Sequence, residues 1–207
     1  ADRAGPPVEI RVVDEAGRDV APDTPGELLV RARGTDPRRR FFSGYLKDAD
    51  ATSAIWADNW LHTGDVVRRS ADGSVFFMDR KKNIIRRSGE NIAAIEVESA
   101  LVTHASVHQC AVIAADDPIR GEEVLAAIVV ASDTSLGQTL ATALFDHCRE
   151  RLAYYKLPGY IVFVDQLPTT STQKVRKHDL GPLAERPMEH PGCHDLRALK
   201  QRARGGG

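Results

Sequence analysis

The sequence predicts an α+β protein: a small, mostly antiparallel β subdomain, followed by a small α/β domain with a short sheet flanked by helices. Two observations lead to this prediction. Up to about residue 80, short apolar–polar alternations are separated by Gly, Pro and Asp, which is typical of antiparallel strands joined by turns. Beyond residue 84, strand-like and helix-like patterns alternate, which is typical of a mixed α/β unit.

The first part contains alternating apolar and polar residues in three short runs, each bounded by turn-forming residues. The expected strands are 8–12, 26–31 and 73–78. Between them, residues 38–40 form a basic run in a loop, which we interpret as a solvated face. We assign residues 1–80 to the β subdomain and residues 81–83 to a hinge.

The second part begins with apolar residues at helical spacing over 91–104, and a second helix is expected from Ser135 to about Leu152. β-branched apolar runs predict strands at 107–114, 124–131 and 160–164. Residues 84–180 therefore form the α/β domain. Residues 181–207 contain Pro, Gly, His and Arg with weak periodicity, so we expect an irregular tail.

The composition narrows the function classes. With 28 Lys plus Arg against 29 Asp plus Glu, the net charge of −1 argues against a dedicated nucleic-acid binder. Three widely spaced cysteines predict reduced thiols and a cytoplasmic protein rather than a disulfide framework or zinc site. No apolar run has the length of a membrane span. Because the sequence lacks an initial Met and opens on a strand-like pattern, we expect a portion of a longer chain.

Three segments carry residues suited to chemistry. In residues 60–65, Gly64 allows the backbone to approach a ligand, and the Asp65 carboxylate can accept hydrogen bonds from two vicinal hydroxyls, as on a ribose. The alternative is an ordinary Thr-Gly-Asp turn. Residues 80–87 hold five cations in eight positions, which can neutralise phosphates or form a solvated linker between domains. Residues 167–176 form a hydroxyl-rich loop that presents Lys174; the alternative is a plain surface loop.

In this order and spacing, the three segments resemble motifs of the adenylate-forming enzymes, the family of acyl-CoA synthetases, nonribosomal adenylation domains and luciferases. Residues 60–65 are similar to the aromatic-x-x-Thr-Gly-Asp motif. Residues 79–96 are similar to the Gly-Arg-x-Asp-Asp-x-Ile-x-x-x-Gly-x-x-Ile-x-x-x-Glu motif, and residues 167–176 to the Leu-Pro-x-Thr-x-x-Gly-Lys-Val/Ile-x-Arg motif. The resemblance covers about residues 5–180.

The resemblance implies an AMP-forming acid–thiol ligase of the kind typical of fatty acid metabolism. A carboxylic acid and ATP would give acyl-adenylate and pyrophosphate, and coenzyme A would then give the thioester and AMP. Mg²⁺ would accompany the triphosphate, and no protein metal site is implied. Asp65 and Arg80 would bind the ribose of ATP or AMP, Lys82 would be the hinge residue, and Lys174 would stabilise the charge that develops during adenylation.

The resemblance also implies contacts with coenzyme A. Ser88, Gly89 and Glu90 would line the channel for its pantetheine arm, and Tyr155 and Lys156 lie where some relatives contact its nucleotide. Core packing is the alternative role for Tyr155.

The sequence also departs from the family pattern. Asp79 and Gln173 each replace a usual glycine, and Asn91 stands where acetate-type members carry Arg. Nothing in the sequence resembles the family's phosphate loop or its Tyr-Gly-x-Thr-Glu segment. We therefore expect the missing amino-terminal adenylating domain to be the chain's partner, and the chain to be inactive alone. Two alternatives stay open: an adenylation domain that serves a carrier protein, and a non-catalytic module that keeps the fold.

Overall fold

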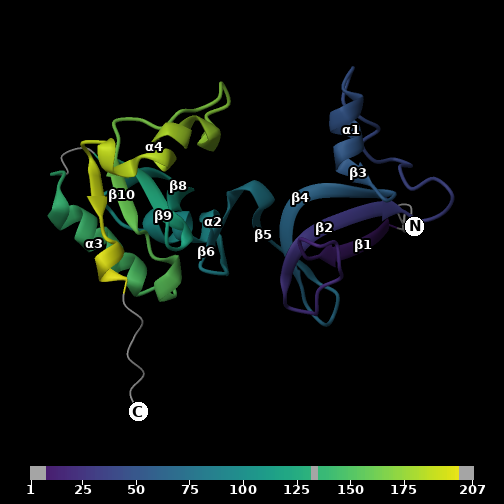
Figure 1. Cartoon of the computed structure of the whole chain (residues 1–207), viewed down its shortest axis with the longest axis horizontal. Coiled ribbons are helices and arrows are strands. Elements are labelled where there is room, and N and C mark those ends of the chain that lie inside the picture. The colour runs from purple at the N-terminus through teal and green to yellow at the C-terminus, as the bar shows by residue number, and fades with distance from the viewer. Residues whose placement is uncertain (1–7, 132–134, 201–207) are drawn as a thin grey trace, which may run out of the picture. The chain divides into compact units, whose positions relative to one another are not determined.

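The computed structural model describes residues 8–131 and 135–200, and the chain divides into two compact units, Ala1–Lys82 and Asn83–Gly207 (Figure 1). The predicted α+β class is confirmed, with an antiparallel sheet in the first unit and a mixed sheet with helices in the second. The division, between Lys82 and Asn83, falls within residues 81–83, which the sequence predicts to be a hinge. Rotation of one unit against the other at this hinge stays a prediction. Within the described ranges, no helix is long and apolar enough to cross a membrane.

The first unit is a five-stranded antiparallel sheet in the order β1-β2-β4-β3, with β5 paired to β4. Its elements are β1 (Val8–Val13), β2 (Pro25–Ala32), α1 (Ala49–Ile55), β3 (Trp56–Ala57), β4 (Trp60–Arg69) and β5 (Val75–Arg80). Its small core is formed by Val13, Leu29 and Trp60. The guanidinium of Arg31 lies 4.3 Å from the centre of a Trp60 ring, so its planar face covers the indole.

The second unit is built on a six-stranded sheet in the order β11-β10-β9-β6-β7, with β8 paired to β9. β9 and β10 are parallel, whereas the other pairs are antiparallel. The strands are β6 (Ile84–Arg87), β7 (Glu90–Ala93), β8 (Val107–Asp117), β9 (Gly121–Val130), β10 (Tyr160–Phe163) and β11 (Cys193–Asp195). The helices are α2 (Ala94–Leu101), α3 (Gln138–Arg149) and α4 (Gly181–Glu185).

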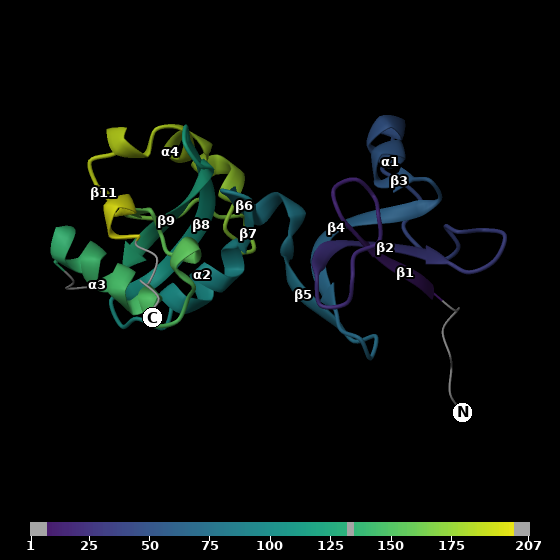
Figure 2. The same ribbon diagram turned by 60° about the horizontal axis from the view of Figure 1, so that its bottom comes forward.

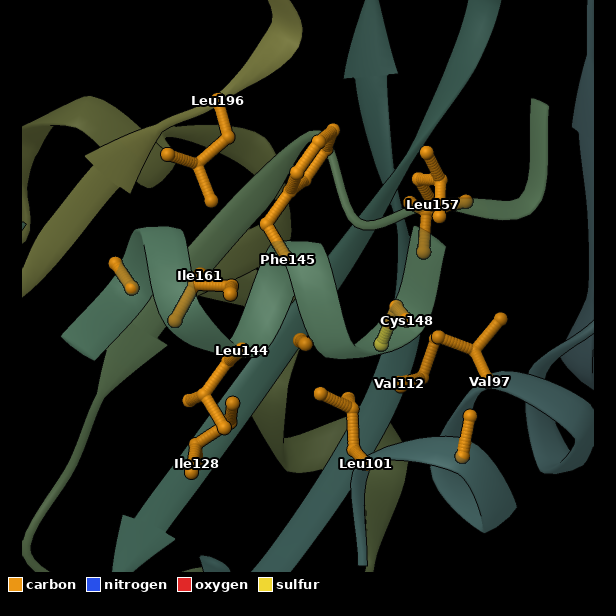
Figure 3. Close-up of a cluster of buried hydrophobic side chains, with 14 of the residues drawn as sticks. Val97, Leu101, Val112, Ile128, Leu144, Phe145, Cys148, Leu157, Ile161 and Leu196 are labelled. Atoms are coloured by element: carbon orange, nitrogen blue, oxygen red, sulfur yellow. The ribbon is translucent and has the colours of Figure 1, made fainter. Parts of the chain in front are cut away.

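The second unit has a hydrophobic cluster on each face of its sheet, and the strand β9 contributes side chains to both. It does so because successive side chains of a strand point to opposite faces. Val124, Ala126 and Ile128 join the large cluster under α2 and α3. Leu125 and Ala127 join the smaller cluster on the other face, toward α4. Figure 2 shows α4 on the opposite side of β8 and β9 from α2 and α3, and Figure 3 shows the larger cluster. A strand buried on both faces therefore fixes the sheet between the helices.

Several element boundaries depart from the sequence prediction, and three departures concern the helices and the tail of the second unit. The helix expected over 91–104 begins only at Ala94, because the preceding residues pair with β6 as the strand β7. The helix expected from Ser135 begins at Gln138. The described part of the expected irregular tail contains α4 and β11, and Leu196 is only 1% exposed. Single buried anchors on very short elements give no periodicity for a sequence pattern to reveal.

Candidate functional site

Asp65 lies in a distortion of the antiparallel sheet. Glu27 of β2 pairs with Val66 and Leu29 pairs with His62, so three residues of β4 face the single residue between them. Gly64, in the middle of the three, has φ = 69°, a conformation that glycine adopts without steric cost. Such a β-bulge re-aims side chains at functional sites. The segment expected as a possible turn is therefore part of a continuous strand with a local bulge.

The Thr63 hydroxyl fixes the bulge. It donates a hydrogen bond to the carbonyl of Leu28 (2.7 Å) and accepts one from the Asp65 backbone N–H (3.1 Å). The bulge is thereby tied to β2 on one side and to Asp65 on the other. Thr63 is a site residue that the sequence prediction does not include, and its position in the Thr-Gly-Asp motif is the sequence signal for it.

Arg80 and Asp65 face each other across β4 and β5, where they are register partners. Arg80 Nε lies 2.9 Å from Asp65 Oδ1, and Arg80 Nη1 donates a hydrogen bond to the carbonyl of Thr63 (3.3 Å). The Nε–Oδ1 approach lacks hydrogen-bond alignment, so the buried Oδ1 accepts no hydrogen bond. The Arg80 charge nevertheless lies next to this oxygen, and the Asp65 side chain as a whole is 26% exposed, so the carboxylate is accessible to a ligand.

The junction between the units is a short 3₁₀ turn, Lys81–Asn83. The Lys81 ammonium lies 2.7 Å from Oε2 of the buried Glu27, which ties it to the first unit. Burial works to raise the pKa of Glu27, but the Lys81 and His62 partners outweigh it and hold the pKa below its usual value. Beyond the turn, the side chain of Ile85 is 1% exposed in the second unit. Lys82 is exposed between these two anchored positions.

Ser88 and Gly89 form the two-residue connection between β6 and β7, where Arg87 and Glu90 are register partners. Both central residues have positive φ, 49° and 85°, as a type I′ hairpin turn requires. The Ser88 N–H donates a hydrogen bond to the carbonyl of Arg120, at the tip of the β8–β9 hairpin (2.9 Å). No atom lies within 4 Å of the position that a Cβ on Gly89 would occupy. The 88–89 turn is therefore exposed, open on its glycine side and held from the neighbouring hairpin.

Lys174 is exposed on a hairpin that precedes α4 and extends from the body of the second unit (Figure 1). Within it, the Thr170 N–H donates to the carbonyl of Lys174 (2.8 Å), and the Lys174 N–H donates to the Thr170 hydroxyl (3.1 Å). Gln173 has φ = 63°, the left-handed conformation that the family's glycine would adopt at no cost. The loop therefore keeps a glycine-like backbone at Gln173 and leaves the Lys174 side chain in solvent.

Lys156 is held by a carboxylate rather than left free. Its ammonium lies 2.7 Å from both oxygens of Glu96 on α2. Tyr155 is half-buried against the larger core cluster, and the Lys156 ammonium lies 5.7 Å from its ring centre. Any contact of these residues with an anionic ligand would compete with Glu96.

A further lysine, Lys177, is also paired. Its Nζ lies 2.6 Å from Oε1 of Glu98, and the same carboxylate oxygen accepts the backbone N–H of Val112 on β8 (2.8 Å). The three cysteines are free, and burial raises the pKa of Cys110 and Cys148 to about 12 and that of Cys193 to about 11. These thiols are protonated near neutral pH and are not nucleophiles.

Comparisons with known proteins assign the chain to a family. Residues 96–174 match the AMP-binding enzyme C-terminal domain. The human mitochondrial acyl-coenzyme A synthetase ACSM5 is 37% identical over 180 residues, which are 86% of this chain and 31% of that protein. The chain spans about a third of the length of the relatives it matches.

Solved structures give the same result. The anthranilate CoA ligase AuaEII in complex with anthranoyl-AMP has a TM-score of 0.74 and 29% identity, covering 88% of this chain and 34% of that one. The o-succinylbenzoate CoA synthetase of Bacillus subtilis, in complex with its acyl-adenylate intermediate, has a TM-score of 0.71 and 31% identity, covering 84% and 33%. The chain belongs to the family of AMP-binding enzymes, and its second unit contains their C-terminal domain. Its relatives are acyl-CoA synthetases and CoA ligases.

Proposed function

We propose that this chain is the carboxyl-terminal, mobile portion of an ATP-dependent acyl-CoA ligase. A carboxylic acid and ATP would form acyl-adenylate and pyrophosphate, and coenzyme A would then displace AMP to give the acyl thioester. The observation that carries the proposal is the partly exposed Asp65 carboxylate, which lies beside Arg80 at the β-bulge fixed by Thr63.

The Asp65 site fits the ribose of ATP or AMP. Two vicinal hydroxyls can donate to one carboxylate, and the Asp65 side chain is 26% exposed beside Arg80. Arg80 adds a cation beside the same carboxylate and helps to orient it. The bulge fixed by Thr63 holds Asp65 in this direction before a ligand arrives.

Lys174 fits the adenylation step. Its side chain is exposed, and its backbone N–H and carbonyl bond to Thr170 of the same hairpin, so movement of the hairpin would carry the ammonium into a closed site and out again. In such a site, its charge would offset the negative charge that develops as the acid's carboxylate attacks the α-phosphorus.

The 88–89 turn, with Glu90, fits the thioester step. All three residues are exposed, and the space beside Gly89 is open. A backbone without a Cβ at this position lets a narrow chain such as pantetheine approach closely. For Tyr155 and Lys156 we propose a secondary role at the coenzyme A nucleotide, which would require exchange of the Glu96 pair.

The proposal requires an upstream adenylating domain as partner, and the isolated chain is expected to be inactive. Exposed apolar side chains on β5 of the first unit are available to it: Phe76 and Phe77, which alternate between the two faces of the strand, are 47% and 56% exposed. As part of the proposal, Mg²⁺ accompanies the triphosphate of ATP; among the described residues, no group of three or more His, Cys, Asp or Glu side chains could hold a metal ion. The three free thiols support a cytoplasmic location as part of the proposal.

The test joins the chain to an upstream adenylating domain and measures pyrophosphate release and thioester formation across a panel of acids. We expect both products to depend on ATP, acid and coenzyme A, and the chain alone to give neither. Asp65→Asn should weaken ATP binding while leaving the fold intact by circular dichroism. Transfer only to a carrier protein would favour the first alternative, an adenylation domain. No adenylate from a correctly folded joined protein would favour a non-catalytic module.

A further inference from the structure

The segment 193–200 is built into the second unit, although it lies outside the residues 96–174 that match the family model. The strand β11 pairs with β10, and the Leu196 N–H donates a hydrogen bond to the carbonyl of Gly159 (2.8 Å). The Leu196 side chain enters the same cluster as Phe145 and Ile161 (Figure 3). These contacts fix the two cations that follow, Arg197 and Lys200, relative to the sheet.

Arg197 reaches the tip of the β8–β9 hairpin through Asp117. Its Nη1 donates to Asp117 Oδ2 (3.1 Å), and Asp117 Oδ1 accepts the backbone N–H groups of Ile119 (3.0 Å) and Arg120 (2.9 Å). The carbonyl of Arg120 in turn accepts the Ser88 N–H. A continuous chain of hydrogen bonds therefore runs from Arg197 to the 88–89 turn.

Two further groups orient the Arg197 side chain. Its Nη2 donates to Asp195 Oδ2 (2.7 Å), and its guanidinium carbon lies 4.8 Å from the centre of the Tyr160 ring. Burial works to raise the pKa of Asp117, but the two backbone N–H groups and Arg197 outweigh it, and the pKa stays below its usual value. Asp117 is therefore a carboxylate at neutral pH and remains an acceptor for all three donors.

Lys200 reaches the residue before the same turn through Glu123. Its ammonium donates to Glu123 Oε1, and Arg87 Nε lies 2.9 and 2.8 Å from the two oxygens of that carboxylate. Arg87 is the residue directly before Ser88. All three side chains are buried: Arg87 is 4% exposed, and Glu123 and Lys200 are 0% exposed. A Cβ on Gly159 would lie 2.4 Å from Glu123 Cγ, so the glycine makes room for this carboxylate.

Stability alone does not explain this arrangement. Two buried cations share one buried carboxylate, and desolvation of ions is expensive. Without Lys200, Arg87 and Glu123 would remain as a balanced pair. The additional lysine therefore adds a connection between the 193–200 segment and the 88–89 turn rather than completing a charge balance.

We propose that Arg197 and Lys200 are positioning residues that hold the 88–89 turn in place through Asp117 and Glu123. The effect of these residues on thioester formation rests on the proposed function, because that turn is the element we assign to the pantetheine arm. The two paths end on consecutive residues at the β6 end of the turn: one on the Ser88 N–H, the other on the Arg87 side chain. Loss of both should let the turn move while the sheet remains intact.

The first test needs no enzymatic activity. Hydrogen exchange of backbone amides is measured by NMR in the 207-residue chain with Arg197→Gln, with Lys200→Met and with both. We expect the double variant to lose about tenfold or more protection at the Ser88 amide, with no change at the Ile128 amide in β9. Arg186→Gln, which removes an exposed cation, is the control and should change neither. Equal loss at both amides, or no loss at Ser88, would overturn the positioning role.

The second test uses the chain joined to an upstream adenylating domain. Both single variants should raise the KM for coenzyme A in thioester formation and leave the rate of adenylate formation unchanged. If adenylate formation falls by the same factor, the assignment of the turn to the thioester step is overturned. If no activity exists at all, the proposed function fails, and the exchange experiment still decides the positioning role.

Discussion

Glu123 is the residue whose replacement should affect the second unit most. It is the single anion between two buried cations, Arg87 and Lys200, and its carboxylate is 0% exposed. Glu123→Gln keeps the shape of the side chain but removes the charge, which leaves two buried cations without a counter-ion. Breaking a buried ion pair in this way costs about 3–5 kcal/mol of unfolding free energy. Part of this cost is relieved if Lys200 loses its proton, so the loss should be greater at pH 7 than at pH 9.

Urea denaturation can assign this loss to the correct unit. Both tryptophans, Trp56 and Trp60, lie in the first unit, so fluorescence follows that unit while far-UV circular dichroism follows both. Glu123→Gln should move the circular dichroism transition and leave the fluorescence transition in place. Glu185→Gln, an exposed carboxylate on α4, is the control. A shift of less than about 1 kcal/mol at pH 7 would refute the reasoning from buried charge.

Three further predictions concern single positions. Burial lowers the pKa of Lys200 to about 8; Arg87 and Arg120 also lower it, whereas Glu123 raises it. Between about pH 8 and 10.5, Lys200 is therefore protonated in the unfolded state but not in the folded state. As pH rises over that window, the unfolding free energy of the wild type should increase by on the order of 3 kcal/mol relative to that of Lys200→Met, as measured by urea titrations. A difference between the two proteins that does not change with pH would contradict the lowered pKa. Gln173→Gly relieves a left-handed residue and should change stability by no more than about 1 kcal/mol, whereas Gln173→Val should be clearly destabilising in thermal melts. In a protein joined to an adenylating domain, Lys82→Pro restricts the backbone of the 3₁₀ turn and should slow thioester formation more than adenylation; equal slowing of both steps in separate half-reaction assays would count against a hinge.

Much of the sheet could be predicted because its strands carry local signals. The alternation in β1 and the apolar runs of β8 and β9 follow directly from which faces are buried. Leu196 could not be predicted, since one buried side chain on a short segment has no period. The bulge at Asp65 depends on hydrogen bonds to β2, which a sequence read along one strand does not contain.

The site residues show the same limit. Asp65, Arg80 and Lys174 can be predicted as site residues because each lies within a recognisable motif, and their roles stay predictions. The partners of Lys156 and Lys177 are on α2, some 60 and 79 residues away in the sequence, and long-range ion pairs leave no local pattern. Lys177 in particular is an ordinary surface lysine by sequence, whereas in the structure it is joined to Glu98.

The central claim is that this chain carries the lysine of the adenylation step on a mobile hairpin, and Lys174→Ala in the joined protein tests it most directly. Lys177→Ala is the control: the loss of its pair with Glu98 should lower stability without changing either half-reaction. Lys174→Ala should slow adenylate formation from acid and ATP by on the order of 10²–10³. With acyl-adenylate supplied, the same variant should form thioester from coenzyme A at close to the wild-type rate. Equal slowing of both half-reactions, or of neither, would contradict the account.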